Sequence, residues 1–290
     1  MRLLSGLHEL SANYDAVLCD VWGVVHNGRR HFAAACEALV RFRRQGGVVV
    51  LITNAPRPNL PIRVQLDGLG VPREAFDDIV TSGDVTLERI VEHGLAPLHH
   101  IGPERDLALF EILRTTTGLN PPRVGLAEAQ YVVCTGLFDD SVETPLDYAP
   151  LLAVMRSRSL ELISANPDIV VHVGERLLYC SGAIAEQYAK LGGKVVQAGK
   201  PFAPIYAAAM GLARKQAGKD INAKRVLAIG DGLRTDVKGA RDYGLDCLFV
   251  TSGIHREDLH ASGVLNLEAA ARLAEGSGIH PSAMIPELVW

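Results

Sequence analysis

Short apolar runs alternate with helically spaced segments along the 290-residue chain. A short run of aliphatic residues bounded by glycine or polar residues is typical of a buried strand, and apolar residues at i, i+3, i+4 and i+7 are typical of a helix. The strand runs are residues 16–20, 46–52, 78–81, 100–102, 130–134, 160–164, 194–197 and 225–230. The helical segments are residues 32–45, 106–114, 149–158, 204–216 and 237–242. This alternation predicts an α/β protein with a parallel sheet.

The order of these elements predicts two domains. A chain of 290 residues is long for a single core. The segment from about residue 96 to residue 192 also has strands and helices of its own. We therefore expect a discontinuous core domain, residues 1–85 and 193–290, interrupted by an inserted α/β domain, residues 86–192. The tail from Gly276 to Trp290 has no pattern that predicts an element.

Composition narrows the class of protein. The chain is 48% apolar and 21% charged, which is ordinary for a globular protein, and its net charge of −4 disfavours nucleic-acid binding. No apolar stretch is long enough to cross a bilayer, so we expect no membrane association. Its five cysteines are widely spaced, which indicates reduced thiols and a cytoplasmic protein.

Two of the predicted strands end in an aspartate. Residues 16–19 run into Asp20, and residues 225–230 run into Asp231. Parallel strands present ligand-binding groups at their carboxyl ends, so the two carboxylates meet if these strands are neighbours. Two negative charges that close need a bound cation or a shared proton, and Mg²⁺ suits carboxylate ligands. Phosphate chemistry is therefore the first hypothesis.

Other polar residues stand at similar positions, each with a simpler structural alternative. Thr53 and Asn54 end a very apolar strand, where they either cap it or hold phosphoryl oxygens. Lys200 stands between Gly199 and Pro201, where a surface turn is the commoner explanation. Asp236 is a second carboxylate five residues after Asp231, and the simpler interpretation is that it only interacts with a helix dipole. The ten histidines show no metal-ligand spacing.

The ordered set of motifs resembles a known family. Asp20-x-x-Gly23, Thr53-Asn54, Gly199-Lys200-Pro201 and Gly230-Asp231-x-x-x-Thr235-Asp236 resemble the four-motif signature of the haloacid dehalogenase superfamily. The inserted segment between the second and third motifs is similar to that of the class IIA phosphatases, the NagD-like group. Residues 165–168 and 180–184 also resemble cap motifs of that group, so the likeness extends to about Leu259.

This resemblance implies a fold and a reaction. The fold would be a Rossmann-like parallel core with a large inserted α/β cap. The reaction would be Mg²⁺-dependent hydrolysis of a small phosphorylated metabolite, such as a sugar phosphate or a nucleotide. A homo-oligomer formed through the cap is an option that the sequence leaves open.

The resemblance also implies residue roles. Asp20 would be the nucleophile that becomes an aspartyl phosphate, Thr53 would bind phosphoryl oxygens and Lys200 would neutralise their charge. Asp231 would hold Mg²⁺ with Asp20 and the carbonyl of Trp22, and Asp236 would orient the waters of the metal. The candidate substrate-binding residues are Asn54, Asn166 and Asp168.

One position departs from the family pattern. The residue two beyond the nucleophile is usually an aspartate that protonates the leaving oxygen. Here it is Trp22, whose indole donates hydrogen bonds but cannot transfer a proton at neutral pH. Loss of acid–base help costs about 10²–10⁴-fold in rate. The enzyme would then be slow or restricted to good leaving groups. His26 is the nearest substitute base in sequence, although a loop histidine that is exposed or hydrogen-bonded to the backbone is the simpler interpretation.

Two other classes of function compete with a phosphatase. Trp22 favours a binding or regulatory protein that keeps the fold and has little activity, whereas the complete set of charged motif residues argues against it. A nucleotide-binding Rossmann protein ranks last, because no Gly-x-Gly-x-x-Gly follows the first strand.

Overall fold

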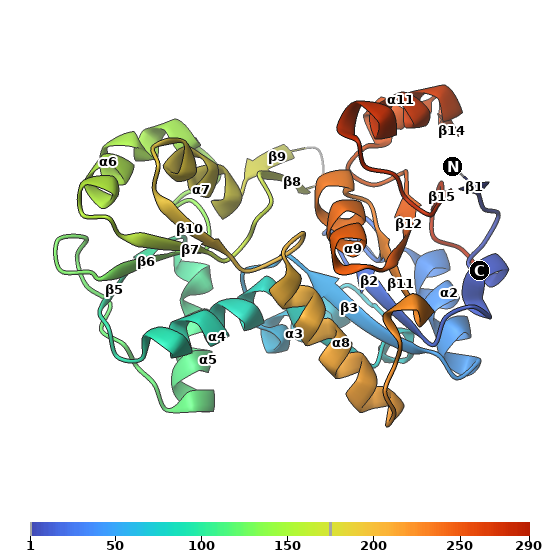
Figure 1. Cartoon of the computed structure of the whole chain (residues 1–290), viewed down its shortest axis with the longest axis horizontal. Coiled ribbons are helices and arrows are strands. Elements are labelled where there is room, and N and C mark those ends of the chain that lie inside the picture. Colours follow the sequence, from blue (N-terminus) through green and yellow to red (C-terminus); the bar gives the residue numbers. More distant parts are fainter. Residues whose placement is uncertain (1, 174–175) are drawn as a thin grey trace. The chain divides into compact units, whose positions relative to one another are not determined.

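The computed structural model describes residues 2–173 and 176–290 (Figure 1). By its internal contacts the chain divides into two compact units. The core unit comprises residues 1–53, 63–80 and 205–290, and the inserted unit comprises residues 54–62 and 81–204. The division into a core and an inserted α/β unit gives the fold class that the sequence predicts.

The core unit is built on a seven-stranded sheet with the order β1-β15-β12-β11-β2-β3-β4. The strands are β1 (Arg2–Leu3), β2 (Ala16–Asp20), β3 (Val48–Thr53), β4 (Asp78–Thr81), β11 (Val226–Gly230), β12 (Asp246–Val250) and β15 (Ala283–Ile285). Every residue of β2, β3 and β11 is buried, because these central parallel strands are covered on both faces. The chain runs from β2 to β3 on one side and from β11 to β12 on the other. The β2–β11 boundary is therefore a switch point, where α/β folds bind ligands.

Helices and short turns connect these strands. They are α1 (His8–Ser11), α2 (Ala33–Arg44), α3 (Asn59–Gly68), η1 (Arg73–Ala75), α8 (Ala203–Ala217), η4 (Ala223–Arg225), η5 (Leu233–Val237), α9 (Lys238–Tyr243), α10 (Arg256–Leu259) and α11 (Leu267–Ser277). A small hairpin joins β13 (His260–Ala261) to β14 (Val264–Leu265). None of the helices in the described ranges has the length and apolar character needed to cross a membrane.

The inserted unit has its own four-stranded parallel sheet, with the order β10-β7-β6-β5. Its strands are β5 (Leu98–Ile101), β6 (Tyr131–Cys134), β7 (Glu161–Ser164) and β10 (Lys194–Gln197), and β8 (Val170–Val173) and β9 (Arg176–Tyr179) form a hairpin. Its helices and turns are α4 (Ser82–His93), η2 (Glu104–Leu107), α5 (Ala108–Thr117), η3 (Pro145–Tyr148), α6 (Ala149–Ser157) and α7 (Ser181–Lys190). Two apolar clusters, one around Tyr188 and one around Tyr131, form its interior.

Two details differ from the sequence expectations. Residues 194–197 were expected in the core domain, but as β10 they pair with β7, so the contact boundary lies near residue 204 rather than at residue 192. The tail, for which no element was predicted, adds β15 beside β12. The pairing of β1 with β15 brings the two ends of the described chain together within the core unit.

Candidate active site

Two aspartates lie side by side at the switch point of the core sheet. The register pairs Cys19 of β2 with Ile229 of β11, so Asp20 lies beside Gly230 and next to Asp231. The sequence-based expectation that these two strands are neighbours is thereby met. On the other side of β2, Asp20 pairs with Ile52 of β3. Thr53, the next residue of β3, is buried and ends that strand.

A third carboxylate joins them. One oxygen from each of Asp20, Asp231 and Asp236 lies within 4.8 Å of the others, and all three residues are buried. Three negative charges at this spacing repel one another strongly away from water. Hard oxygen ligands of this kind fit a small divalent cation, which removes the repulsion. The donor set therefore fits the metal that the sequence predicts.

Backbone groups orient two of these carboxylates. The Val21 N–H donates to Asp20 Oδ1 at 2.7 Å, and the Ile254 N–H donates to Asp231 Oδ2 at 2.7 Å. Gly23 lies directly against Asp231, because a Cβ at this position would be 2.0 Å from Asp231 Oδ2. Gly23 also has a φ of +84°, which a residue with a side chain adopts only under strain. A glycine is thus needed three residues after the first aspartate.

Asp236 is held by the wide helical turn η5. The Gly232 N–H donates to Asp236 Oδ2 at 3.0 Å, and the Thr235 hydroxyl donates to the same oxygen at 3.2 Å. The Tyr206 hydroxyl of α8 donates to the carbonyl of Asp236 at 3.3 Å. These contacts fix the carboxylate in the cluster, which a role in the helix dipole alone would not need.

Trp22 packs within the loop that follows β2. Its indole meets the ring of His26 edge-on, with centroids 5.0 Å apart. The indole also covers Gly28, where a Cβ would be 2.6 Å from the ring. The loop closes as the Gly23 N–H donates to the His26 carbonyl at 2.8 Å. Trp22 thus shapes the loop by packing.

His26 has a structural role in the same loop. It is 2% exposed, and its Nδ1 accepts the Gly28 N–H at 2.9 Å. Because the Gly28 N–H can only donate, Nδ1 carries a lone pair and the proton of the neutral ring is on Nε2. Burial lowers the pKa of His26 to about 4. The geometry therefore favours the simpler interpretation over a substitute base.

Lys200 and Asn54 are bound to each other in the inserted unit. Asn54 Oδ1 accepts the Lys200 N–H at 2.7 Å, while Asn54 Nδ2 donates to the Lys200 carbonyl at 3.1 Å and to Asp168 Oδ1 at 2.8 Å. Both amide hydrogens of Asn54 are thus engaged within the chain. Substrate contact by Asn54 and Asp168 stays a prediction. The structure shows that Asn54 holds the Lys200 backbone and that Asp168 accepts from Asn54, contacts that the sequence did not suggest.

Asn166 closes the turn before β8. Its Oδ1 accepts the Asp168 N–H at 3.0 Å, and its own N–H donates to Ser181 Oγ at 3.0 Å. The predicted cap motifs at residues 165–168 and 180–184 therefore contact each other. The sequence missed Ile254, although the aliphatic strand β12 before it is the same kind of signal as the strands before the two aspartates.

Comparisons with known proteins match both halves of the chain to one family of hydrolases. A model of the haloacid dehalogenase-like hydrolases matches residues 17–112, and a model described as HAD-hydrolase-like matches residues 197–275. These ranges contain Asp20, Thr53, Lys200, Asp231 and Asp236. A solved haloacid dehalogenase-like hydrolase from Brucella suis is 46% identical, with a TM-score of 0.86, covering 99% of this chain and 100% of its own.

Curated relatives are more distant but cover most of the chain. The 5'-nucleotidase YutF of Bacillus subtilis is 25% identical over 84% of this chain and 90% of its own length. The ribonucleotide monophosphatase NagD of Escherichia coli is 26% identical over 83% of this chain and 89% of its own length.

The core sheet, the cluster of aspartates and these matches together define the class. The chain belongs to the haloacid dehalogenase-like hydrolase family. It is an enzyme of that family that is similar to NagD over most of its length, and it has a tryptophan at the position two beyond the first aspartate.

Proposed function

We propose that this hydrolase is a Mg²⁺-dependent phosphatase of small phosphorylated metabolites, and that it works through an aspartyl phosphate on Asp20. The observation that carries the proposal is the cluster of three buried carboxylates within 4.8 Å. Such a cluster is costly unless a cation neutralises it. The names of the relatives YutF and NagD support a nucleotide or a similar phosphate ester as substrate.

The proposed reaction has two displacements. A carboxylate oxygen of Asp20 attacks phosphorus, the bond from phosphorus to the leaving oxygen breaks, and the leaving group departs as an oxyanion that takes its proton from water. Water then attacks the phosphorus of the aspartyl phosphate, which releases phosphate and restores Asp20. Thr53 binds the transferring oxygens and Lys200 neutralises their charge, as the family resemblance implies. Bound Mg²⁺ would offset the negative charge of the phosphoryl group.

Asp20, Asp231 and the carbonyl of Trp22 would hold the metal. Asp236 would orient its waters, a role that suits a carboxylate already fixed by Gly232 and Thr235. The protein's own part is to keep these oxygens in place before substrate arrives. Positioning and charge neutralisation supply most of the catalysis in phosphoryl transfer.

Trp22 sets the expected substrate preference. An indole cannot transfer a proton at neutral pH, and the lone pair of His26 Nδ1 is engaged with Gly28. The leaving oxygen must therefore depart with little protonation, so aryl and acyl phosphates should react faster than alkyl phosphates. A binding or regulatory protein with little activity is the second candidate, and this same missing proton donor is the observation that favours it.

Phosphate release from a panel of aryl, alkyl and nucleotide phosphates, with and without Mg²⁺, tests the proposal. We expect Mg²⁺-dependent release that is fastest for aryl phosphates and is lost in Asp20→Asn. Trp22→Asp should gain most on alkyl phosphates, with Trp22→Asn as the control for lost packing. Absence of release from every substrate by the wild type and by Trp22→Asp would favour the binding protein. A cytoplasmic location and a homo-oligomer through the inserted unit stay predictions.

A further inference from the structure

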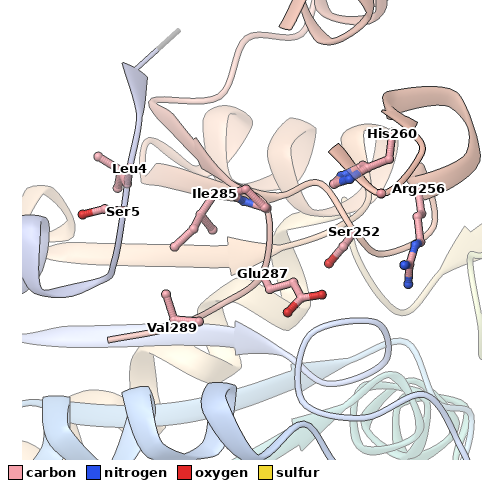
Figure 2. Close-up of a pocket in the computed structure, with 10 residues that line it drawn as sticks. Leu4, Ser5, Ser252, Arg256, His260, Ile285, Glu287 and Val289 are labelled. Carbon is pink, nitrogen blue, oxygen red and sulfur yellow. The ribbon is translucent and has the colours of Figure 1, made fainter. Parts of the chain in front are cut away.

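A pocket of about 390 Å³ opens on the core unit between the segment after β1, the loop after β12 and the chain after β15 (Figure 2). Its volume lies within the range of small-molecule sites, roughly 300–1,000 Å³. All of its lining residues belong to the core unit. The site residues described above are not among them.

The lining of this pocket separates into two ends. Figure 2 shows Leu4, Ile285 and Val289 toward one end and Ser252, Arg256 and Glu287 toward the other. Leu4 and Ile285 are buried and form an apolar floor, while Arg256 and Glu287 are exposed at the rim. A ligand that fits both ends must itself be amphipathic.

The polar end carries two opposite charges. The side chains of Arg256 and Glu287 form no hydrogen bond or ion pair with any residue in the described part of the chain. A ligand with only a negative charge would be repelled by the carboxylate of Glu287. A ligand with only a positive charge would be repelled by the guanidinium of Arg256. A molecule with one charge of each sign matches both.

We propose that this pocket binds an aliphatic α-amino acid or a zwitterion of the same chemistry. Its carboxylate pairs with the Arg256 guanidinium and the Ser252 hydroxyl, and its ammonium group pairs with Glu287. Its side chain rests on the floor formed by Leu4 and Ile285. The charge-assisted hydrogen bonds supply orientation, and the apolar contact discriminates between side chains.

The loop after β12 links this pocket to the aspartate cluster. Ser252 and Arg256 line the pocket, and between them Ile254 donates its N–H to Asp231 Oδ2 at 2.7 Å. Gly253 is packed so closely that a Cβ there would lie 1.9 Å from the same oxygen. A ligand that holds Ser252 and Arg256 therefore restrains the segment that orients Asp231. This coupling, unlike the binding itself, rests on the proposed metal site.

Calorimetry with L-leucine on the metal-free, full-length protein tests the binding. Leucine should bind at least about tenfold more tightly than 4-methylpentanoate, which lacks the amine, and than 3-methylbutylamine, which lacks the carboxylate. Glycine, which lacks the side chain, should also bind more weakly. Equal binding of either singly charged analogue, or no heat with millimolar leucine, overturns the proposal.

Variants at the rim test where leucine binds. Arg256→Gln and Glu287→Gln should each weaken leucine binding at least about tenfold without a change in the circular dichroism spectrum. Arg272→Gln on α11 is the matched control, because Arg272 is exposed and pairs only weakly with Glu268 at 3.7 Å. Unchanged affinity in both rim variants places leucine elsewhere and overturns the assignment.

The coupling has a separate measurement. Saturating leucine should tighten Mg²⁺ binding by at least about fivefold, and Mg²⁺ should tighten leucine binding by the same factor. Leucine binding with unchanged Mg²⁺ affinity overturns the coupling alone. A protein that binds leucine but hydrolyses no phosphate ester contradicts the proposed function and leaves the pocket assigned.

Discussion

Each of the two parallel sheets has polar side chains at the carboxyl edge of its strands. In the inserted unit these polar groups form hydrogen bonds with one another, whereas in the core unit they cannot. In the core unit, Asp20, Asp231 and Asp236 bring three like charges within 4.8 Å. In the inserted unit, the Ser164 and Ser181 hydroxyls lie 3.1 Å apart. Hydroxyls donate and accept, so they can pair with one another, whereas carboxylates only accept.

This difference distinguishes a ligand-binding site from an internal hydrogen-bond network. Ser181 also donates to the carbonyl of Asn166 at 2.8 Å, and His100 Nε2 lies 3.0 Å from Thr135 Oγ1. These groups complete one another and need no ligand. The carboxylates of the core edge gain hydrogen bonds from the backbone, yet their mutual repulsion remains and points to a cation.

The largest effect should follow removal of one charge from the core edge. In Asp231→Asn, Mg²⁺ affinity should fall by more than the roughly 10–100-fold loss typical of an outer-shell partner. Without metal, the same variant should be more stable by about 1–3 kcal/mol, because repulsion is relieved. Calorimetry and urea unfolding measure both quantities.

The control for this prediction is Asp220→Asn, an exposed carboxylate paired with Arg214. It should leave Mg²⁺ affinity unchanged. Mg²⁺ at about 100 times its Kd should stabilise the wild type by about 2.7 kcal/mol and should not stabilise Asp231→Asn at that concentration. Equal stabilisation of wild type and Asp231→Asn would mean that the metal binds elsewhere. The carboxyl edge of the core sheet would then not be distinguished from that of the inserted sheet by a bound cation.

The contrast between the edges was partly predictable from sequence. Continuous aliphatic runs before Asp20 and Asp231 predicted two buried parallel strands, and the motif order predicted that these strands are neighbours. Strands at 130–134 and 160–164 were recognised by the same pattern and became β6 and β7. Short buried strands are local in composition, so a single sequence reveals them.

Pairing between distant segments was not predictable in the same way. Residues 194–197 were recognised as a strand, but nothing local shows that β10 joins β7 rather than the core sheet. The N–H groups of Ile254 and Lys200 are present in every residue type except proline, and the Lys200 carbonyl is present in all residue types, so the sequence does not reveal these contacts. Only the tertiary structure determines which backbone groups make these contacts.

A second prediction compares one buried histidine from each unit. Burial lowers the pKa of His26 and of His100 to about 4 from the usual 6.5. For each residue the unfolded chain binds the proton more tightly. The neutral ring therefore adds stability that is present above pH 6.5 and is lost as pH falls from 6.5 toward 4. The loss should be about 2–4 kcal/mol per histidine.

Proton NMR titration measures both pKa values, and urea unfolding at pH 7.5 and pH 5 measures the loss. His26→Asn keeps an acceptor for the Gly28 N–H and should reduce the pH dependence, as should His100→Asn. A pKa above 6.5 at His26 but not at His100 would show that the negative core edge reaches this ring and outweighs burial. The electrostatic difference between the two sheet edges would then also affect the loop that follows β2.

The smallest effect on Mg²⁺ binding should come from the edge of the inserted sheet, where the hydroxyls pair with one another. Ser181 is buried, receives the Asn166 N–H at 3.0 Å and donates to the Asn166 carbonyl at 2.8 Å. Ser181→Ala leaves the Asn166 N–H without its acceptor and removes one of the two hydroxyls that donate to the Asn166 carbonyl, so unfolding should become easier by about 1–3 kcal/mol. Ser157→Ala, an exposed serine of the same unit, should change stability by less than about 0.5 kcal/mol. Mg²⁺ affinity should stay the same in both variants. A loss of Mg²⁺ affinity in Ser181→Ala would show that the inserted unit's network supports the metal site and that the two edges do not act independently.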